Sequence, residues 1–248
     1  MAKYFDEAEL ANTLTRADWY LDLFLKYGEL AKNHEAVEEF YAFIEQRLAA
    51  GAVLLGKSGP DWDRERRPVD TVVVHHTHCP PGITRERLSA MHLVRLYAAN
   101  YASPAPSDYH KQGDAIFSGH FWKEKPRETG EAAVSRGKQV FYAYHWIIRM
   151  DGTAERLLAD DELGWHAGDW GVNCRSVGIV LDNNFEEETP PDAVVGGLAR
   201  LIRERYAHVS RERIMGHREV SPKTTCPGKG FLGGWKDTLF RTRPPVTS

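Results

Sequence analysis

The chain has 248 residues, of which 42% are hydrophobic and 27% charged, with a formal net charge of -3 at pH 7. A chain of this length can bury a sizeable core as one large domain, or as one domain with an appendage. Acidic and basic residues are interspersed. No basic face is therefore available to bind a phosphate backbone, and we expect no nucleic-acid partner.

The amino-terminus begins Met1-Ala2-Lys3-Tyr4-Phe5-Asp6-Glu7 and turns acidic without an apolar segment behind it. We therefore expect no secretory signal peptide. No uninterrupted apolar run approaches the roughly 20 residues that span a bilayer. These features predict a soluble protein made in the cytoplasm, which a holin or a secretion machine can still export. The oligomeric state is left open.

The three cysteines, Cys79, Cys174 and Cys226, are an odd number and do not describe a disulfide framework. If Cys226 binds a metal, the other two are either a pair or two buried free thiols. Two free thiols are the simpler interpretation.

The first 55 residues are expected to be helical. Thr15 is suited to cap one segment, Asn33 is suited to cap a second, Gly28 separates the two and Gly51 ends the second. The apolar residues that follow these caps are Tyr20, Phe24 and Tyr27 in the first segment, and Val37, Phe40, Ile44 and Leu48 in the second. Residues 56–68 hold glycine, proline and charge without periodicity. We predict a helical appendage at 1–55, a linker at 56–68 and a main domain at 69–240.

From Val69 onward, patterns of strand and helix alternate. The run from Val69 to His75 is typical of a strand covered on both faces, and Thr84 can cap the helix that follows, with Leu88, Met91, Val94 and Ala98 on one side. Residues 100–138 have weak periodicity and are expected to form a long loop, which is usually functional at that length.

The second half of the main domain continues the alternation. We predict strands at 139–150, 154–158 and 177–181, a hairpin turn at Asp151-Gly152, a helix opened by Pro190-Pro191-Asp192, and a short strand at Ile214-Met215. The predicted fold class is α/β, with a central mixed β-sheet flanked by helices and with ligands gathered at strand ends.

Three residues at such strand ends are compatible with zinc: His75, His217 and Cys226. Two imidazoles and one thiolate leave a fourth position for water, which is the pattern of a catalytic site. Neighbours on a strand point to opposite faces, so only one of His75 and His76 can face such a site. On spacing alone, a buried neutral Cys226 beside a loop histidine remains an equal alternative.

Several motifs in order across residues 69–235 give the chain a wider resemblance. They are Val73-Val74-His75-His76-Thr77, Tyr144-His145-Trp146-Ile147-Ile148-Arg149 with Asp151-Gly152-Thr153, Gly164-Trp165-His166-Ala167-Gly168, Asn173 with Ser176-Val177-Gly178-Ile179, and Gly216-His217-Arg218-Glu219-Val220 with Cys226-Pro227-Gly228. Together they make the chain similar to the zinc-dependent N-acetylmuramoyl-L-alanine amidases, the family of phage lysozyme-type amidases and peptidoglycan recognition proteins.

The resemblance implies a role for each matching residue. His75, His217 and Cys226 would bind Zn²⁺, and Tyr144 would orient the attacking water or stabilise the oxyanion. His166 would line the substrate groove near the metal. Apart from the resemblance, Trp165 can stack on a sugar or cover a peptide, although core or rim packing is the commoner role of a tryptophan. Thr224 is also assigned to the substrate site, and Asn183 at a strand end can contact peptide, with a plain strand-end turn as an equal alternative. The substrate would be peptidoglycan or a muropeptide, cut at the amide between the N-acetylmuramic acid lactyl group and L-alanine.

One departure concerns the donor to the oxyanion. In many relatives the interval from histidine to cysteine is one residue shorter, with lysine or threonine two places before the thiol. This chain has Thr224 there and Lys223 one place earlier. Either can hold the role, and Lys223 is the one we favour. Some relatives use a glutamate on the third strand in place of the tyrosine. This chain has Val180 at that position, so it matches the relatives that use a tyrosine, here Tyr144.

Two other functions stay open. A non-hydrolytic peptidoglycan-binding module can share this fold, but such relatives typically lack the thiol that Cys226 supplies here. A metal amidase for another acylated substrate is the second. The setting is open among a phage endolysin, an intracellular recycling enzyme and an effector delivered into rival cells.

Overall fold

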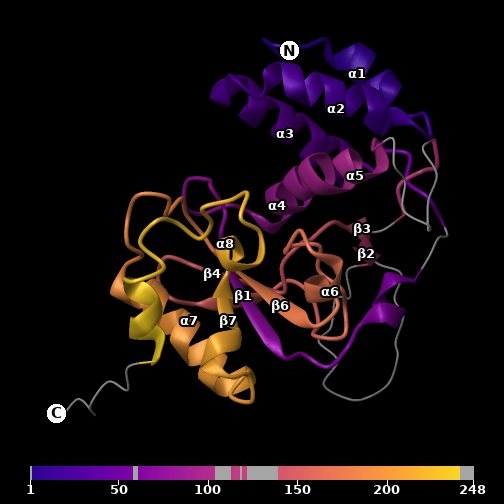
Figure 1. The fold of residues 1–248 in the computed structure, drawn as a ribbon. Helices are drawn as coiled ribbons and strands as arrows, with labels where there is room; N and C mark the ends of the chain where they lie inside the picture. The colour runs from indigo at the N-terminus through magenta and orange to yellow at the C-terminus, as the bar shows by residue number, and fades with distance from the viewer. Residues whose placement is uncertain (1, 58–60, 104–112, 118, 122–138, 241–248) are drawn as a thin grey trace. The chain divides into compact units, whose positions relative to one another are not determined.

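The computed structural model describes residues 2–57, 61–103, 113–117, 119–121 and 139–240 (Figure 1). The chain divides into two compact units, one of Met1–Trp62 with Thr84–Tyr142 and one of Asp63–Ile83 with Ala143–Ser248. Each unit draws on two stretches of sequence. The linear order of appendage, linker and domain expected from the sequence remains a prediction. Within the described ranges, no helix is both long and apolar enough to cross a membrane.

The first unit is mainly helical. Its elements are α1 (Glu7–Thr13), α2 (Trp19–Leu30), α3 (His34–Ala49), α4 (Arg85–His92), the π-helical turn Leu93–Ala98, α5 (Ala99–Tyr101), and the strands β2 (His120–Phe121) and β3 (Gln139–Val140). Consecutive helices α1 to α4 contact one another, and α4 runs on through the π-helical turn into α5 (Figure 1). The apolar side predicted for the helix after Thr84 is buried along α4 and the π-helical turn, at Leu88, Met91, Val94 and Ala98.

Two predicted caps of this unit are confirmed and one is wrong. Asn33 accepts a hydrogen bond from Ala36 N at 3.2 Å, and Thr84 accepts one from Arg87 N at 3.1 Å. Thr15, however, caps no helix, because its hydroxyl donates to the Asn12 carbonyl in the turn after α1. The sequence interpretation missed α1, which Asp6 caps.

Gly28 does not separate two helices, since it lies inside α2. Gly51, with φ +65°, does follow the end of α3 as expected. The predicted strand 139–150 is two strands, because β3 pairs with β2 whereas Trp146–Ile148 (β4) belongs to another sheet. Most of the predicted loop 100–138 lies outside the described residues.

The second unit is built on a mixed five-stranded sheet in the order β5-β4-β6-β1-β7, which confirms the predicted α/β class. Its strands are β1 (Thr71–His76), β4, β5 (Ala154–Arg156), β6 (Ser176–Leu181) and β7 (Ile214–Gly216). Only β5 is antiparallel to its neighbour, through the hairpin turn at Asp151-Gly152, where Gly152 has φ +82°. The helices are α6 (Trp170–Asn173), α7 (Asp192–Arg205) and α8 (His217–Val220). The 3-10 turns among the described residues are Trp62–Glu65, Arg211–Arg213 and Trp235–Phe240.

The two faces of this sheet have different roles. Val72 and Val74 of β1 join a buried cluster with residues of α7, among them Val194 and Leu198. Figure 1 shows α7 beside the sheet. Successive strand residues point to opposite faces, so His75 projects from the other face. The parallel alignment of β1, β6 and β7 brings their carboxyl ends to one edge, which is where the functional residues gather.

Candidate metal centre

Three donor groups from distant parts of the chain meet at this edge of the sheet. The ligand atoms of His75, His217 and Cys226 all lie within 4.8 Å of one another. His75 Nδ1 is 3.8 Å from Cys226 Sγ, and the rings of His75 and His217 have centroids 4.7 Å apart. The three residues that the sequence singles out therefore form one group.

Strand pairing places the two histidines. β1 and β7 are parallel, and Val74 lies opposite Gly216. The next residues, His75 and His217, are therefore level at the carboxyl ends of adjacent strands. α8 starts at His217, and Gly216 N donates to Glu219 Oε2 at 2.7 Å, which fixes the turn from strand to helix.

The loop that carries Cys226 is held by its main chain. Arg218 N donates to the Cys226 carbonyl at 2.8 Å, and Cys226 Sγ accepts a hydrogen bond from His76 N at 3.4 Å. Gly228 follows with φ +116°, and a Cβ built there would lie 1.9 Å from the Phe185 carbonyl oxygen. A residue other than glycine would therefore displace the loop that presents the thiol.

The arrangement fits a zinc ion with an open position. Two donors bound to one tetrahedral Zn²⁺ at about 2.0 and 2.3 Å lie roughly 3.5 Å apart, close to the separation of His75 Nδ1 and Cys226 Sγ. Two nitrogens and one sulfur are the softer donors that suit zinc, and three protein ligands leave one position for water or substrate. Burial lowers the pKa of His217, which favours the neutral form that binds a metal.

A second group of His76, His78 and Glu186 also has its ligand atoms within 4.8 Å. Here the hydrogen bonds oppose metal binding. His76 Nδ1 accepts a hydrogen bond from Phe185 N at 2.8 Å, so the ring proton of neutral His76 is on Nε2. Nε2 is the nitrogen that faces Glu186 Oε2, 3.9 Å away. Because this nitrogen carries the proton, it has no lone pair to offer a metal, and we assign no metal to this group.

Two further predicted site residues lie against His75. The ring of Tyr144 has its centroid 4.8 Å from that of His75 and is half-buried. His166 is 5% exposed, and its Nδ1 lies 3.1 Å from His75 Nε2. His166 is thus buried against the Nε2 side of His75, and its substrate-lining role remains a prediction.

A family model described as N-acetylmuramoyl-L-alanine amidase matches residues 65–229, about two thirds of the chain. The chain belongs to this amidase family. The match begins before β1 and ends after Cys226, so it covers all three donors.

Two relatives of this family member are described as endolysins. The one from Klebsiella phage KP32 is 32% identical over 98 residues, which are 38% of this chain and 63% of the relative. The one from Enterobacteria phage K11 is 34% identical over 89 residues, which are 34% of this chain and 57% of the relative. The chain thus spans less than two thirds of the length of either relative.

Among solved structures, the chain is similar to the N-acetylmuramoyl-L-alanine amidase LysC from Clostridium intestinale URNW. The identity is 22% and the TM-score 0.43, with 70% of this chain and 86% of the other covered.

The other predicted site residues of this amidase-family chain lie in the loops around the donors. Thr224 Oγ1 accepts a hydrogen bond from Cys226 N at 3.1 Å, whereas Lys223 is exposed. Trp165 is half-buried, and its ring is 6.1 Å from that of Trp170. Asn183 lies just after the end of β6, and its Oδ1 accepts a hydrogen bond from Asn184 N at 2.8 Å.

Asp182, the residue after β6, supports the segment that follows β1. This carboxylate, 1% exposed, accepts hydrogen bonds from Gly82 N at 3.0 Å, Ile83 N at 3.3 Å and Arg149 at 2.8 Å. It therefore fixes residues 82–83, in the segment that follows β1. A strand-end aspartate was visible in the sequence, but its partners come from segments about 100 and 33 residues away.

Asn173 holds the loop that carries His166. Its Oδ1 accepts hydrogen bonds from His166 N at 3.2 Å and Ala167 N at 2.9 Å. Cys79, Cys174 and Cys226 form no disulfide bond, so the alternative of a disulfide pair is wrong.

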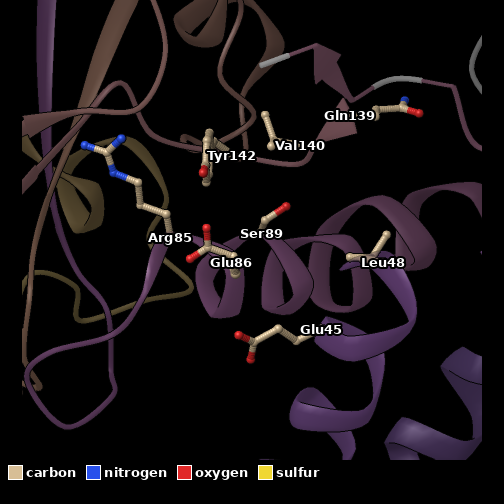
Figure 2. A pocket seen from close by; sticks show the side chains of 8 residues that line it. All are labelled: Glu45, Leu48, Arg85, Glu86, Ser89, Gln139, Val140 and Tyr142. Carbon is tan, nitrogen blue, oxygen red and sulfur yellow. The ribbon is translucent and has the colours of Figure 1, made fainter. Parts of the chain in front are cut away.

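A cavity of about 220 Å³ lies within the first unit, lined from α3, α4, β3 and Tyr142 just after β3 (Figure 2). Its lining residues are Glu45, Leu48, Arg85, Glu86, Ser89, Gln139, Val140 and Tyr142. Ser89 Oγ already accepts a hydrogen bond from Phe141 N at 2.9 Å. The cavity is smaller than the roughly 300–1,000 Å³ usual for ligand pockets, and we assign it no ligand.

Proposed function

We propose that this chain is a zinc-dependent N-acetylmuramoyl-L-alanine amidase. Its substrate is peptidoglycan or a muropeptide, cut between the lactyl group of N-acetylmuramic acid and L-alanine. The observation that carries this proposal is the convergence of His75, His217 and Cys226 within the segment that matches the amidase family. The endolysin descriptions of two relatives support the bacterial cell wall as the site of action.

The reaction is a hydrolysis that needs no redox partner. The oxygen of water forms a bond with the lactyl carbonyl carbon, the carbon–nitrogen bond breaks, and a proton passes to the leaving nitrogen. The products are a muramic lactyl carboxylate and a peptide with a free L-alanine amine. When bound, Zn²⁺ supplies Lewis-acid catalysis and makes water a competent nucleophile at neutral pH.

The protein's own residues hold and orient the reacting groups. His75, His217 and Cys226 would bind the metal. Tyr144 stands beside His75, where its hydroxyl can orient the water or donate to the developing oxyanion. Lys223 is the favoured second donor because it is exposed and cationic, and Thr224 is the alternative because it adjoins the thiol.

Substrate contacts are assigned to the loops around the donors. Trp165 and Trp170 bracket His166 and offer aromatic surface to a sugar or a peptide. Asn183 lies after β6 at the same edge of the sheet as the carboxyl end of β1. We propose Trp165 and Asn183 as substrate contacts and treat His166 separately below.

The proposal predicts products that mass spectrometry can identify. Purified wild-type protein loaded with zinc should release new lactyl carboxylates and free L-alanine amines from peptidoglycan. Chelation should abolish the release, and zinc should restore it. Cys226→Ala should reduce the release to the background level, because the site then lacks its thiolate.

Cys79→Ala is the matched control, since it removes a thiol that is not one of the three donors. It should keep wild-type activity. Cleavage of glycan chains, or full activity without metal, would contradict the proposal. Binding of peptidoglycan without any cleavage would favour the non-hydrolytic peptidoglycan-binding module. Cleavage of other acyl amides alone would favour a metal amidase for another acylated substrate.

A further inference from the structure

His166 is a buried histidine beside the metal centre that the proposed chemistry does not use. Its Nδ1 lies 3.1 Å from His75 Nε2, and its Nε2 lies 3.2 Å from Ser176 Oγ. Both ring nitrogens of His166 are therefore engaged inside the protein, one with a proposed metal ligand and the other with a strand residue. Which nitrogen carries the proton decides what His166 does to His75.

The hydroxyl of Ser176 settles the direction of these hydrogen bonds. Ser176 Oγ donates to the Val172 carbonyl oxygen at 2.7 Å. A hydroxyl has one hydrogen and a carbonyl oxygen has none, so the hydrogen of Ser176 is committed to Val172. The contact between Ser176 Oγ and His166 Nε2 can then be a hydrogen bond only if Nε2 is the donor.

The proton on His166 Nε2 fixes the next contact. A neutral imidazole has one N–H, so His166 Nδ1 presents a lone pair. His75 Nε2 must donate to that lone pair, and His75 Nδ1 is left without a proton. This nitrogen is the atom that lies 3.8 Å from Cys226 Sγ.

We infer that His166 and Ser176 form a positioning relay that holds His75 in the tautomer able to bind the metal through Nδ1. The inference rests on the proposed function, since it assumes that His75 is a metal ligand. Metal-binding histidines generally donate their second ring N–H to a fixed acceptor, which sets the tautomer and the ring orientation. Here the acceptor is another imidazole, and its own tautomer is set by a serine.

Strand geometry provides the space for this relay. Ser176 and Gly178 are two residues apart on β6 and point to the same face as His75, which lies opposite Val180. A Cβ built on Gly178 would lie 2.7 Å from Cγ of His166. The His166 ring thus lies over the position that a side chain at 178 would occupy, and glycine is required there for packing.

The test compares variants of the relay in the metal-free and zinc-loaded protein. In metal-free wild type, ¹⁵N-edited NMR of the imidazoles should find the proton of both His75 and His166 on Nε2. His166→Ala should release His75 into a mixture of tautomers and weaken zinc binding by about 10- to 100-fold in competition with a chelator. Gly178→Ala should have a similar effect while His166 is still present, because its methyl group displaces the ring.

Two further variants distinguish a role of His166 in positioning His75 from a general effect on folding. His166→Asn retains an acceptor oxygen near the place of Nδ1 and should recover part of the zinc affinity. His34→Ala removes an exposed histidine of α3 and should leave both the tautomers and the affinity unchanged. Thermal unfolding of each metal-free variant should confirm that it is folded.

The outcomes distinguish this inference from the proposed function. Zinc affinity equal in wild type and His166→Ala, or a His75 proton on Nδ1, would overturn the relay and leave the amidase intact. Failure of the wild type to bind zinc would overturn both. Predicted tautomers and weakened zinc binding, with no cleavage of peptidoglycan by wild type, would support the relay and contradict the amidase.

Discussion

At the scale of single residues, Tyr144 offers the sharpest test of the proposed chemistry. Its ring is 4.8 Å from that of His75, but it is not one of the three donors. Tyr144→Phe removes only a hydroxyl, so zinc affinity should stay at the wild-type value. If the hydroxyl donates to the oxyanion, kcat should fall by about 10²- to 10³-fold.

The measurement is the rate of L-alanine amine release at saturating muropeptide. Tyr27→Phe is the control, because Tyr27 lies in α2, where its hydroxyl is 3.0 Å from that of Tyr41. It should keep wild-type kcat. An unchanged kcat in Tyr144→Phe would remove Tyr144 from the mechanism and leave the oxyanion to Lys223 or Thr224.

Among single residues, the sequence predicted the three donors but not the residue that supports them. His75, His217 and Cys226 were predicted from strand-end positions and from motifs shared with a family, and the structure brings them together. The position of His166 behind His75 was not predicted. This position depends on a hydrogen bond to Ser176 and on Gly178, which leaves room for the ring of His166. The spacing of residues in the sequence reveals neither contact.

At the scale of secondary-structure elements, α4 carries a buried histidine that makes stability depend on pH. His92 is 5% exposed, and burial lowers its pKa to about 3 from an ordinary value of 6.5. Between these values the unfolded chain binds the proton and the folded chain does not. The free energy of unfolding therefore falls as the pH falls from 6.5 toward 3.

His92→Gln is neutral at every pH and should remove this contribution. For the metal-free proteins, unfolding by denaturant at pH 6.5 and pH 5 should show wild type losing about 2 kcal/mol more than the variant. His34→Gln, at an exposed site, should keep the wild-type dependence. Equal slopes in wild type and His92→Gln would show that His92 is not buried in its neutral form.

Sequence signals that act within a few residues predicted helix caps and a hairpin turn correctly. The caps at Asn33 and Thr84, and the hairpin at Asp151-Gly152, depend on contacts within a few residues. The strand predicted at 139–150 failed because its two ends pair in different sheets. Apolar periodicity reports which residues are buried, but it does not report which partner strand buries them.

At the scale of the whole molecule, the α/β class and the elements β1, α4, β5, β6, α7 and β7 follow from alternation in the sequence. β2 lies in the stretch expected to be a loop, and α6 was not predicted. The strand order β5-β4-β6-β1-β7 does not follow from alternation, since pairing between distant segments leaves no local pattern. This order makes β1 and β7 neighbours and brings His75 beside His217. Parallel pairing therefore creates the metal centre from residues about 140 positions apart.

The central claim is that one zinc ion is held by two imidazoles and one thiolate, with a fourth position open. X-ray absorption at the zinc edge of the loaded protein measures this most directly. We predict one sulfur at about 2.3 Å and nitrogen or oxygen neighbours at about 2.0–2.1 Å, with the sulfur lost in Cys226→Ala. A zinc spectrum without sulfur in the wild type would contradict the account.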